Sequence, residues 1–272
     1  MVGQRNSCDG SSQDPLEASE SEPRKNGKAE ATDRYHSTHF RYMAEVPNDE
    51  TCRAYEAFAE YLPERKDARI LDFGAGNGLF LYYLKTQGYQ NVVGLEAYRE
   101  QVEYVREHVT EKIYLSREPV KFLREHRGEH DLVTMFNVIE HIEKGQIVSV
   151  LRAIRESLAP GGHLLISTPN MARLTGGLYS RYLDFTHEVG FVETSLKQVL
   201  WLAGFCDIEI RPDRLWSGSL HPRSLLAATV RFFYRQMLKL VYFIERPGET
   251  RPSVYISPCL VAFAAKVEQQ ER

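Results

Sequence analysis

Short apolar runs alternate with segments of helical periodicity along most of the chain. Runs typical of buried strands lie at 69–73, 91–96, 112–115, 131–136, 163–168, 205–211 and 258–266, and helical patterns lie at 77–87, 98–109, 118–126, 143–158 and 195–203. Strands and helices in alternation predict a parallel sheet covered by helices, which is an α/β fold. The turn Pro160-Gly161-Gly162 supports this prediction, because it would end one helix and lead into the next strand.

The amino-terminal part of the chain lacks this alternation. Residues 1–34 are rich in Ser, Glu, Lys and Gly and have almost no large apolar side chains. Such a segment cannot bury enough surface to offset the entropy cost of ordering, so we predict a disordered tail. Residues 35–272 then form one domain, with a helix predicted over 49–62 near its start. The apolar face of that helix consists of Tyr55, Phe58, Ala59 and Leu62.

Two long segments, 169–194 and 212–256, interrupt the alternation, and insertions of this length are usually functional or linkers. The first is predicted as a loop over the carboxyl end of the sheet. The second contains a predicted helix over 223–246 with an apolar stripe and a basic row. The stripe is Leu226, Val230, Phe233, Met237, Leu240 and Ile244, and the row is Arg231, Arg235 and Lys239. We expect the stripe to pack on the domain, as a lid or in a homodimer contact; contact with a membrane surface is the alternative.

The composition is ordinary for a soluble globular protein, with 43% hydrophobic and 26% charged residues among 272. The net charge of −3 gives no general attraction to polyanions, so we expect no nucleic-acid partner. The cysteines Cys8, Cys52, Cys206 and Cys259 form no CxxC pair, which favours reduced thiols over a zinc site. Without a secretory signal or an apolar run of about 20 residues, the expected location is cytoplasmic.

A glycine-rich loop follows the first strand of the alternating region, in the stretch "ILDFGAGNGLF". Gly74, Gly76 and Gly78 would let the backbone approach part of a nucleotide closely. The dinucleotide fingerprint requires a glycine at the position of Leu79, so a nicotinamide cofactor is disfavoured. Glu96 ends the next strand about 20 residues on, where a carboxylate can accept hydrogen bonds from both ribose hydroxyls. The loop and Glu96 together predict a bound ribose.

The stretches "ILDFGAGNGLFLYYLKTQGYQNVVGLE", "DLVTMFNVIEHI" and "LAPGGHLLISTPN" resemble the class I S-adenosylmethionine (SAM) methyltransferases over residues 50–211. The resemblance implies a Rossmann-like sheet of seven strands with an antiparallel last strand, helices on both faces and a helical insertion before that strand. It implies SAM as the cofactor, with Gly74, Gly76 and Gly78 beside its methionine part, Glu96 at the ribose, and Glu118 or Arg117 near the adenine. Asp72 and Asn137 complete the expected cofactor contacts.

A hydroxyl acceptor needs a base, and the resemblance directs attention to two histidines that could serve as one. His141 follows Glu140 after the fourth strand, and His187 lies in "RYLDFTHE" together with Asp184. We therefore expect His187, His141 and Asp184 on the catalytic side. Similar small-RNA methyltransferases bind a metal through a Glu-x-x-Glu-His motif, but Asn137 replaces its first Glu, so we expect no metal.

The sequence is compatible with three functions. The "RYLDFTHE" box and the helical insertion resemble bacterial methyltransferases of cell-surface polysaccharide gene clusters, which implies a hydroxyl of a sugar or glycan precursor as the acceptor. The alternative enzyme would methylate a quinone, phenol or other small metabolite, and an aromatic pocket formed by Tyr35, Phe40 and Tyr42 could serve either acceptor. A SAM-binding protein without turnover is the third reading.

Overall fold

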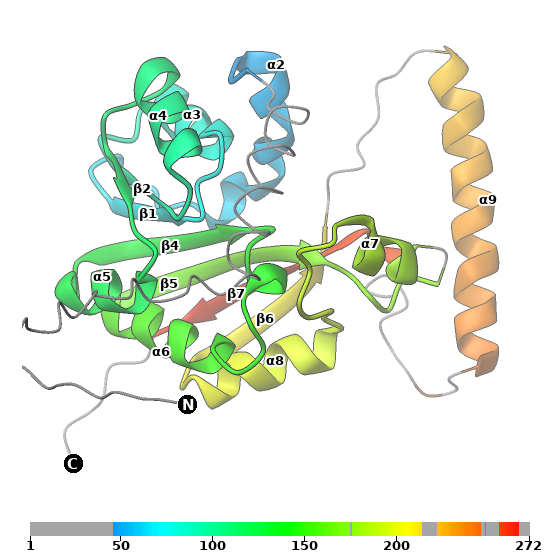
Figure 1. Ribbon diagram of the computed structural model, residues 1–272. Coiled ribbons are helices and arrows are strands. Elements are labelled where there is room, and N and C mark those ends of the chain that lie inside the picture. Colours follow the sequence, from blue (N-terminus) through cyan, green and yellow to red (C-terminus); the bar gives the residue numbers. More distant parts are fainter. Residues whose placement is uncertain (1–45, 175, 214–221, 246–247, 249–255, 267–272) are drawn as a thin grey trace, which may run out of the picture.

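The computed structural model describes residues 46–174, 176–213, 222–245, 248 and 256–266. Seven strands form a single sheet in the order β3-β2-β1-β4-β5-β7-β6 (Figure 1). They are β1 (Arg69–Phe73), β2 (Asn91–Glu96), β3 (Ile113–Leu115), β4 (His130–Phe136), β5 (Leu158–Pro169), β6 (Cys206–Pro212) and β7 (Cys259–Ala265). The tail predicted over 1–34, Cys8 and the aromatic residues Tyr35, Phe40 and Tyr42 lie outside the described residues.

β7 runs antiparallel to both of its neighbours, β5 and β6, while β1 to β5 pair in parallel. His163 pairs with Ala265 and Pro169 with Cys259, so the β5–β7 ladder covers more than half of β5. The predicted seven-stranded sheet with an antiparallel last strand is therefore confirmed. The reversal of strand order beside β1 leaves a crevice at the carboxyl ends of β1 and β4, where open α/β sheets usually bind their ligands.

Helices cover both faces of the sheet (Figure 1). They are α2 (Asp49–Cys52), the 3₁₀ helix η1 (Arg53–Tyr61), α3 (Leu79–Thr86), α4 (Arg99–His108), α5 (Pro119–Glu125), the 3₁₀ turn η2 (Ile139–His141), α6 (Ile147–Ser157), α7 (Gly177–Leu183), α8 (Glu193–Leu202) and α9 (Pro222–Glu245). One core joins α5, α6 and α8 to the strands through residues such as Leu123, Ile154 and Leu200, and a second joins η1, α3 and α4 through Phe58, Leu84 and Val105. The result is a three-layer fold.

The segment predicted as one α-helix over 49–62 is a short α2 followed by the 3₁₀ helix η1. A 3₁₀ helix repeats every three residues, so Cys52, Tyr55, Phe58 and Tyr61 share one side. Cys52 and Phe58 are buried and Tyr55 is half-buried, whereas Ala59 is exposed. The predicted face was therefore wrong at Ala59, because the prediction assumed the α-helical period.

The junction between α6 and β5 also differs from the prediction. β5 begins at Leu158, five residues before the predicted strand, and Leu158 pairs with His130 beside a bulge in β4. A Cβ at Gly162 would lie 2.9 Å from the His130 carbonyl oxygen, so glycine permits this close pairing. The segment Pro160-Gly161-Gly162 therefore lies inside the strand, and does not end a helix.

Each of the two insertions contains a helix. The first carries α7, a short helix that the sequence-based reading had as loop. The second carries the predicted helix α9, whose apolar stripe does not pack on the domain as expected: Val230, Phe233, Met237, Leu240 and Ile244 are all exposed. The side chain of Leu226, predicted in the same stripe, lies outside the described side chains.

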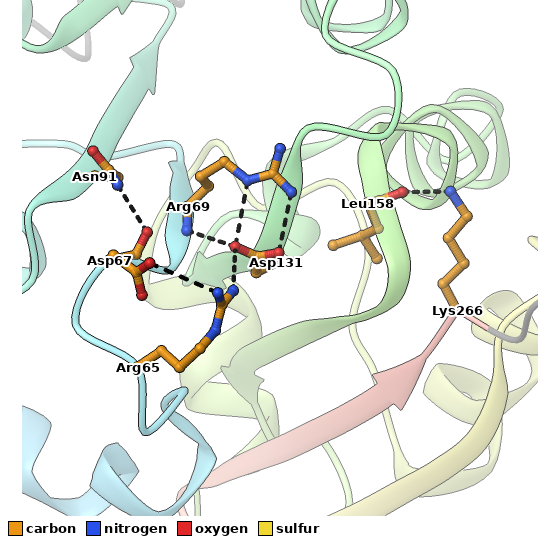
Figure 2. Close-up of polar contacts among 7 residues, drawn as sticks. All are labelled: Arg65, Asp67, Arg69, Asn91, Asp131, Leu158 and Lys266. Atoms are coloured by element: carbon orange, nitrogen blue, oxygen red, sulfur yellow. Dashed lines mark hydrogen bonds and ion pairs between the residues drawn. The ribbon is translucent and has the colours of Figure 1, made fainter.

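A polar network fixes the amino ends of the strands, at the edge away from the glycine loop (Figure 2). Asp131 in β4 accepts hydrogen bonds from the backbone N–H of Arg69 in β1 (2.8 Å) and from its guanidinium (3.2 Å). Arg65 adds an ion pair with Asp131 at 3.5 Å. Lys266 Nζ donates to the carbonyl of Leu158, which ties the chain after β7 to the start of β5.

Cys52, Cys206 and Cys259 are free thiols. Among the described residues, no helix combines the length and apolarity needed to cross a bilayer.

Candidate functional site

The glycine loop connects β1 to α3 and is held against β2. The N–H groups of Gly74 and Ala75 both donate to the Leu95 carbonyl, at 2.8 and 3.1 Å. Gly74 and Gly76 have φ of +77° and +54°, a region that favours glycine. A Cβ at Gly74 would lie 2.5 Å from Val138 Cγ2, whereas a Cβ at Gly76 would meet nothing within 4 Å. Gly74 therefore permits close packing, and Gly76 faces open space.

Glu96 is the last residue of β2, and its carboxylate is surrounded by donors. Oε2 accepts from the Gly76 N–H at 2.9 Å, and Oε1 accepts from the N–H groups of Ala97 (2.7 Å) and Tyr98 (3.1 Å). With its amide nitrogen turned toward the carboxylate, Gln101 donates to Oε1 at 3.0 Å. Burial raises the pKa of Glu96, and the backbone hydrogen bonds oppose that rise. These contacts fix the position of one carboxylate directly beside the glycine loop.

A cavity of about 750 Å³ lies over the carboxyl ends of β1, β2 and β4. Four predicted cofactor residues line it: Gly74, Gly76, Glu96 and Asn137. Asn137 has a φ of +54°, which Asn tolerates better than most residues, and its N–H donates to the Ser167 carbonyl at 2.9 Å. Much of the remaining wall is apolar, formed by Phe73, Phe136, Val138, Ile142, Val150 and Phe185. Its size and lining are typical of a small-molecule site.

Three other predicted cofactor residues do not line this cavity. Asp72 is buried beneath the loop, where Thr134 Oγ1 donates to its Oδ1 at 2.8 Å, and burial raises the pKa of Asp72 to about 7. Gly78 lies one residue before α3, and Glu118 lines a separate depression at the start of α5. Arg117, the alternative to Glu118, does line the main cavity. Direct cofactor contact by Asp72, Gly78 or Glu118 therefore has no support in this geometry.

His141 lies in the wall of the cavity and is oriented by two residues of the first insertion. The Thr186 hydroxyl donates its single proton to Asp184 Oδ1 at 2.7 Å, so at 2.8 Å it accepts from His141 Nδ1–H. This tautomer places the basic lone pair of His141 on Nε2. Asp184 and Thr186 therefore support His141, and Asp184 itself does not line the cavity.

His187 also lies behind the cavity wall. Its Nδ1 donates to the Ser180 carbonyl at 2.9 Å, and its ring meets His141 edge-on with the centroids 4.7 Å apart. Of the two histidines predicted as bases, His141 is thus the one that lines the cavity and His187 packs against it. Their catalytic roles stay predictions.

Glu140 and His187 lie close to His141. Each offers one ligand atom, and these atoms lie within 4.8 Å of one another, so the three side chains could hold a metal ion. Thr168 Oγ1 donates to Glu140 Oε2 at 3.0 Å, while Oε1 is buried without a hydrogen-bond partner among the described residues. Burial raises the pKa of Glu140 to about 7, so this carboxyl is partly neutral near physiological pH. The sequence-based expectation of no metal stays a prediction.

Thr186 is a cavity-lining residue that the sequence-based prediction missed. Its backbone N–H and its hydroxyl both bond to Asp184 Oδ1, at 2.8 and 2.7 Å. An Asp that bonds the backbone two residues on is a common turn motif, so Asp184-Phe185-Thr186 carried a local signal. The contact of Thr186 with His141 spans 45 residues and had no such signal.

These features define a class of protein, in which an open α/β sheet binds a nucleoside beside a glycine loop and a strand-end carboxylate. Residues 39–210 match the family described as methyltransferase domain, and the chain belongs to that family. Structural comparison agrees with this fold. A SAM-dependent methyltransferase from Archaeoglobus fulgidus aligns with a TM-score of 0.60 at 18% identity, over 80% of this chain and 94% of that one.

Two similar proteins have names that specify an activity. The ubiquinone biosynthesis O-methyltransferase of Cronobacter sakazakii is 30% identical over 118 residues, which is 40% of this chain and 47% of the relative. That of Shewanella pealeana is 31% identical over 106 residues, or 38% and 44% of the two chains. The chain therefore spans about half the length of the curated relatives it matches.

S-adenosylmethionine is the cofactor of this domain, and the described residues fit it. Gly76 has no neighbour within 4 Å of its Cβ position and lines the cavity, so ligand atoms can approach the backbone there. The Glu96 carboxylate lines the same cavity and can accept hydrogen bonds from a ribose. Phe136 and Val138, the neighbours of Asn137 in the chain, line the same cavity.

Proposed function

We propose that the protein is an O-methyltransferase whose acceptor hydroxyl binds in the apolar part of the cavity, next to His141. SAM supplies an activated methyl group, and the protein must place the acceptor oxygen in line with it. The observation that carries the proposal is the chain Asp184–Thr186–His141, which ends in the cavity wall.

His141 would act as the general base. His141 Nε2 would take the proton of the acceptor hydroxyl as its oxygen is methylated, while SAM held beside Gly76 and Glu96 would supply the methyl group and be released as S-adenosylhomocysteine. The hydrogen bond from Nδ1–H to Thr186 holds the ring in the tautomer that this step requires. The negative charge of Asp184, transmitted through the Thr186 hydroxyl, would stabilise the imidazolium that forms.

The apolar lining favours a phenol or quinol as the acceptor. Phe136, Ile142 and Phe185 offer contact surface for a ring, which a polyhydroxylated sugar would not match as well. The names of the two relatives above point to the same class, although the chain matches only about half of each.

The sugar acceptor predicted from the sequence remains a second candidate. Glu143, Gln146 and Glu188 also line the cavity, and polar side chains of this kind hydrogen-bond sugar hydroxyls. We rank a sugar acceptor below a phenol or quinol, because these polar residues share the cavity wall with a larger apolar surface.

The test is a turnover assay with radiolabelled SAM and two acceptor panels, one of catechols and one of nucleotide sugars and monosaccharides. Methyl transfer to a catechol hydroxyl that is lost in His141→Ala supports the proposal. Transfer only to the sugar panel favours the second candidate. Binding of S-adenosylhomocysteine without transfer to any acceptor of either panel supports a SAM-binding protein without turnover.

A further inference from the structure

The second insertion presents an apolar helix face to solvent. Seven apolar side chains of α9 are more than half exposed: Val230 (60%), Phe232 (57%), Phe233 (65%), Met237 (53%), Leu240 (59%), Phe243 (70%) and Ile244 (68%). At 100° per residue these seven side chains fall within one arc of about 160° around the helix. Soluble monomers rarely expose contiguous apolar surface of this kind without a function.

The opposite side of α9 attaches it to the domain. Leu238 and Tyr242 are buried, and the Tyr242 hydroxyl donates to the carbonyl of Ala172 in the first insertion. These two residues lie about 160° from the centre of the exposed arc, because one helical turn takes 3.6 residues. The attachment of α9 therefore fixes its apolar face outward.

Most of the charge on α9 is positive. The segment 222–245 contains four basic residues and one acidic residue, a net charge of +3 in a chain whose total is −3. Arg235 and Lys239 are exposed. By helical spacing Lys239 lies between the buried Tyr242 and the exposed Phe232 and Phe243, at the border of the apolar face. Such a border suits a basic side chain that reaches lipid phosphate while its stem covers apolar surface.

We propose that α9 binds in the interface of an anionic membrane, with its exposed apolar face toward the acyl chains and Lys239 at the headgroups. No described helix can span a bilayer, so α9 would lie in the membrane plane. A second copy of this chain fits the face less well, because pairing two α9 helices would bring together two segments of charge +3. The inference does not depend on which hydroxyl is methylated.

The experiment is co-sedimentation of the full chain with vesicles of phosphatidylcholine, with and without about 30% phosphatidylglycerol. The matched variants are Phe243→Glu and Trp201→Glu, since both aromatic residues are exposed, at 70% and 71%, and only Phe243 lies on α9. We expect binding to the anionic vesicles alone, a partition coefficient at least about tenfold lower for Phe243→Glu, and no change for Trp201→Glu. Lys239→Gln should lower binding about fivefold.

The inference is overturned if the wild-type chain stays in the supernatant with anionic vesicles, or if Phe243→Glu and Trp201→Glu bind equally. Light scattering after size exclusion measures whether a second copy of the chain binds this face instead. If the wild type is a dimer, Phe243→Glu is a monomer and neither binds vesicles, the face belongs to a dimer interface. Equal affinity of both variants for S-adenosylhomocysteine shows that each is folded.

Discussion

The Thr186 hydroxyl lies 2.8 Å from Nδ1 of His141 and gives its own proton to Asp184. Two segments 45 residues apart thus meet at one hydrogen bond, at the wall of the cavity that the glycine loop and Glu96 also line. Because the hydroxyl has a single proton, its donation to Asp184 determines which nitrogen of His141 carries a proton.

Thr186→Val should lower kcat about tenfold, the scale of one lost hydrogen bond, while the affinity for S-adenosylhomocysteine stays unchanged. Thr186→Ser keeps the hydroxyl and should retain most of the activity. Steady-state kinetics across pH would check the assignment, since loss of the Asp184 contact should move the acidic limb of the profile. Equal activity of the Val and Ser variants would remove Thr186 from the mechanism.

His141→Ala should reduce turnover by about 10²–10⁴-fold, the usual contribution of a general base. His187→Ala should cost less, because His187 supports the His141 ring from behind the cavity wall. The comparison uses single-turnover rates at saturating SAM, with calorimetry to confirm that both variants bind S-adenosylhomocysteine. If His187→Ala were the more damaging variant, the base would have to be reassigned.

Gly74→Ala should destabilise the protein and weaken cofactor binding, because the added methyl group meets Val138 Cγ2 at 2.5 Å. Gly128→Ala is the matched control, since φ at Gly128 is +73° against +77° at Gly74, but its Cβ would meet nothing within 4 Å. Backbone strain alone should cost about 1–2 kcal/mol at each site. Urea unfolding and calorimetry would show whether Gly74→Ala costs more; equal effects would exclude a packing role.

Asp72 should make stability depend on pH. Its pKa rises from 3.8 to about 7 on folding, chiefly through burial, so the folded protein holds a proton that the unfolded chain releases. The resulting stabilisation is fully present below about pH 4 and is lost as pH rises through about 7. Asp72→Asn should therefore be more stable than wild type near pH 8, by an amount on the order of 1–3 kcal/mol, and similar near pH 4.

Urea titrations at several pH values would measure this difference between the two proteins. Glu140, whose pKa is also raised to about 7, would leave a residual slope in Asp72→Asn. Wild type and variant losing stability in parallel above pH 5 would show that Asp72 is already ionised when folded.

The sequence predicted the sheet well because its strands are buried and its glycine loop has a distinctive spacing. β1 and β2 match their predicted ranges, and the carboxylate at the end of β2 lies beside the loop as expected. Two local predictions were wrong. Ala59 was placed on the buried face because the prediction assumed the α-helical period, whereas η1 is a 3₁₀ helix. Gly162 was expected to follow the end of a helix, but it lies inside β5 and permits close pairing with β4.

The catalytic side was less predictable, because it depends on contacts between distant segments. Asp184 and His187 were found by their types, but only the fold shows that His141 lines the cavity and that Thr186 connects it to Asp184. The orientation of α9 could not be predicted from the sequence either, since an amphipathic pattern is compatible with an apolar face that points toward the domain or toward solvent.

Calorimetric titration with S-adenosylhomocysteine, on the wild-type chain and on Glu96→Ala, tests the central claim that the cavity beside Gly76 and Glu96 is the cofactor site. We predict clear binding to the wild type and a loss of more than about 1 kcal/mol in the variant, the scale of a hydrogen bond to a charged group. Absence of binding heat with the folded wild type, or unchanged affinity in a folded Glu96→Ala, would contradict the claim.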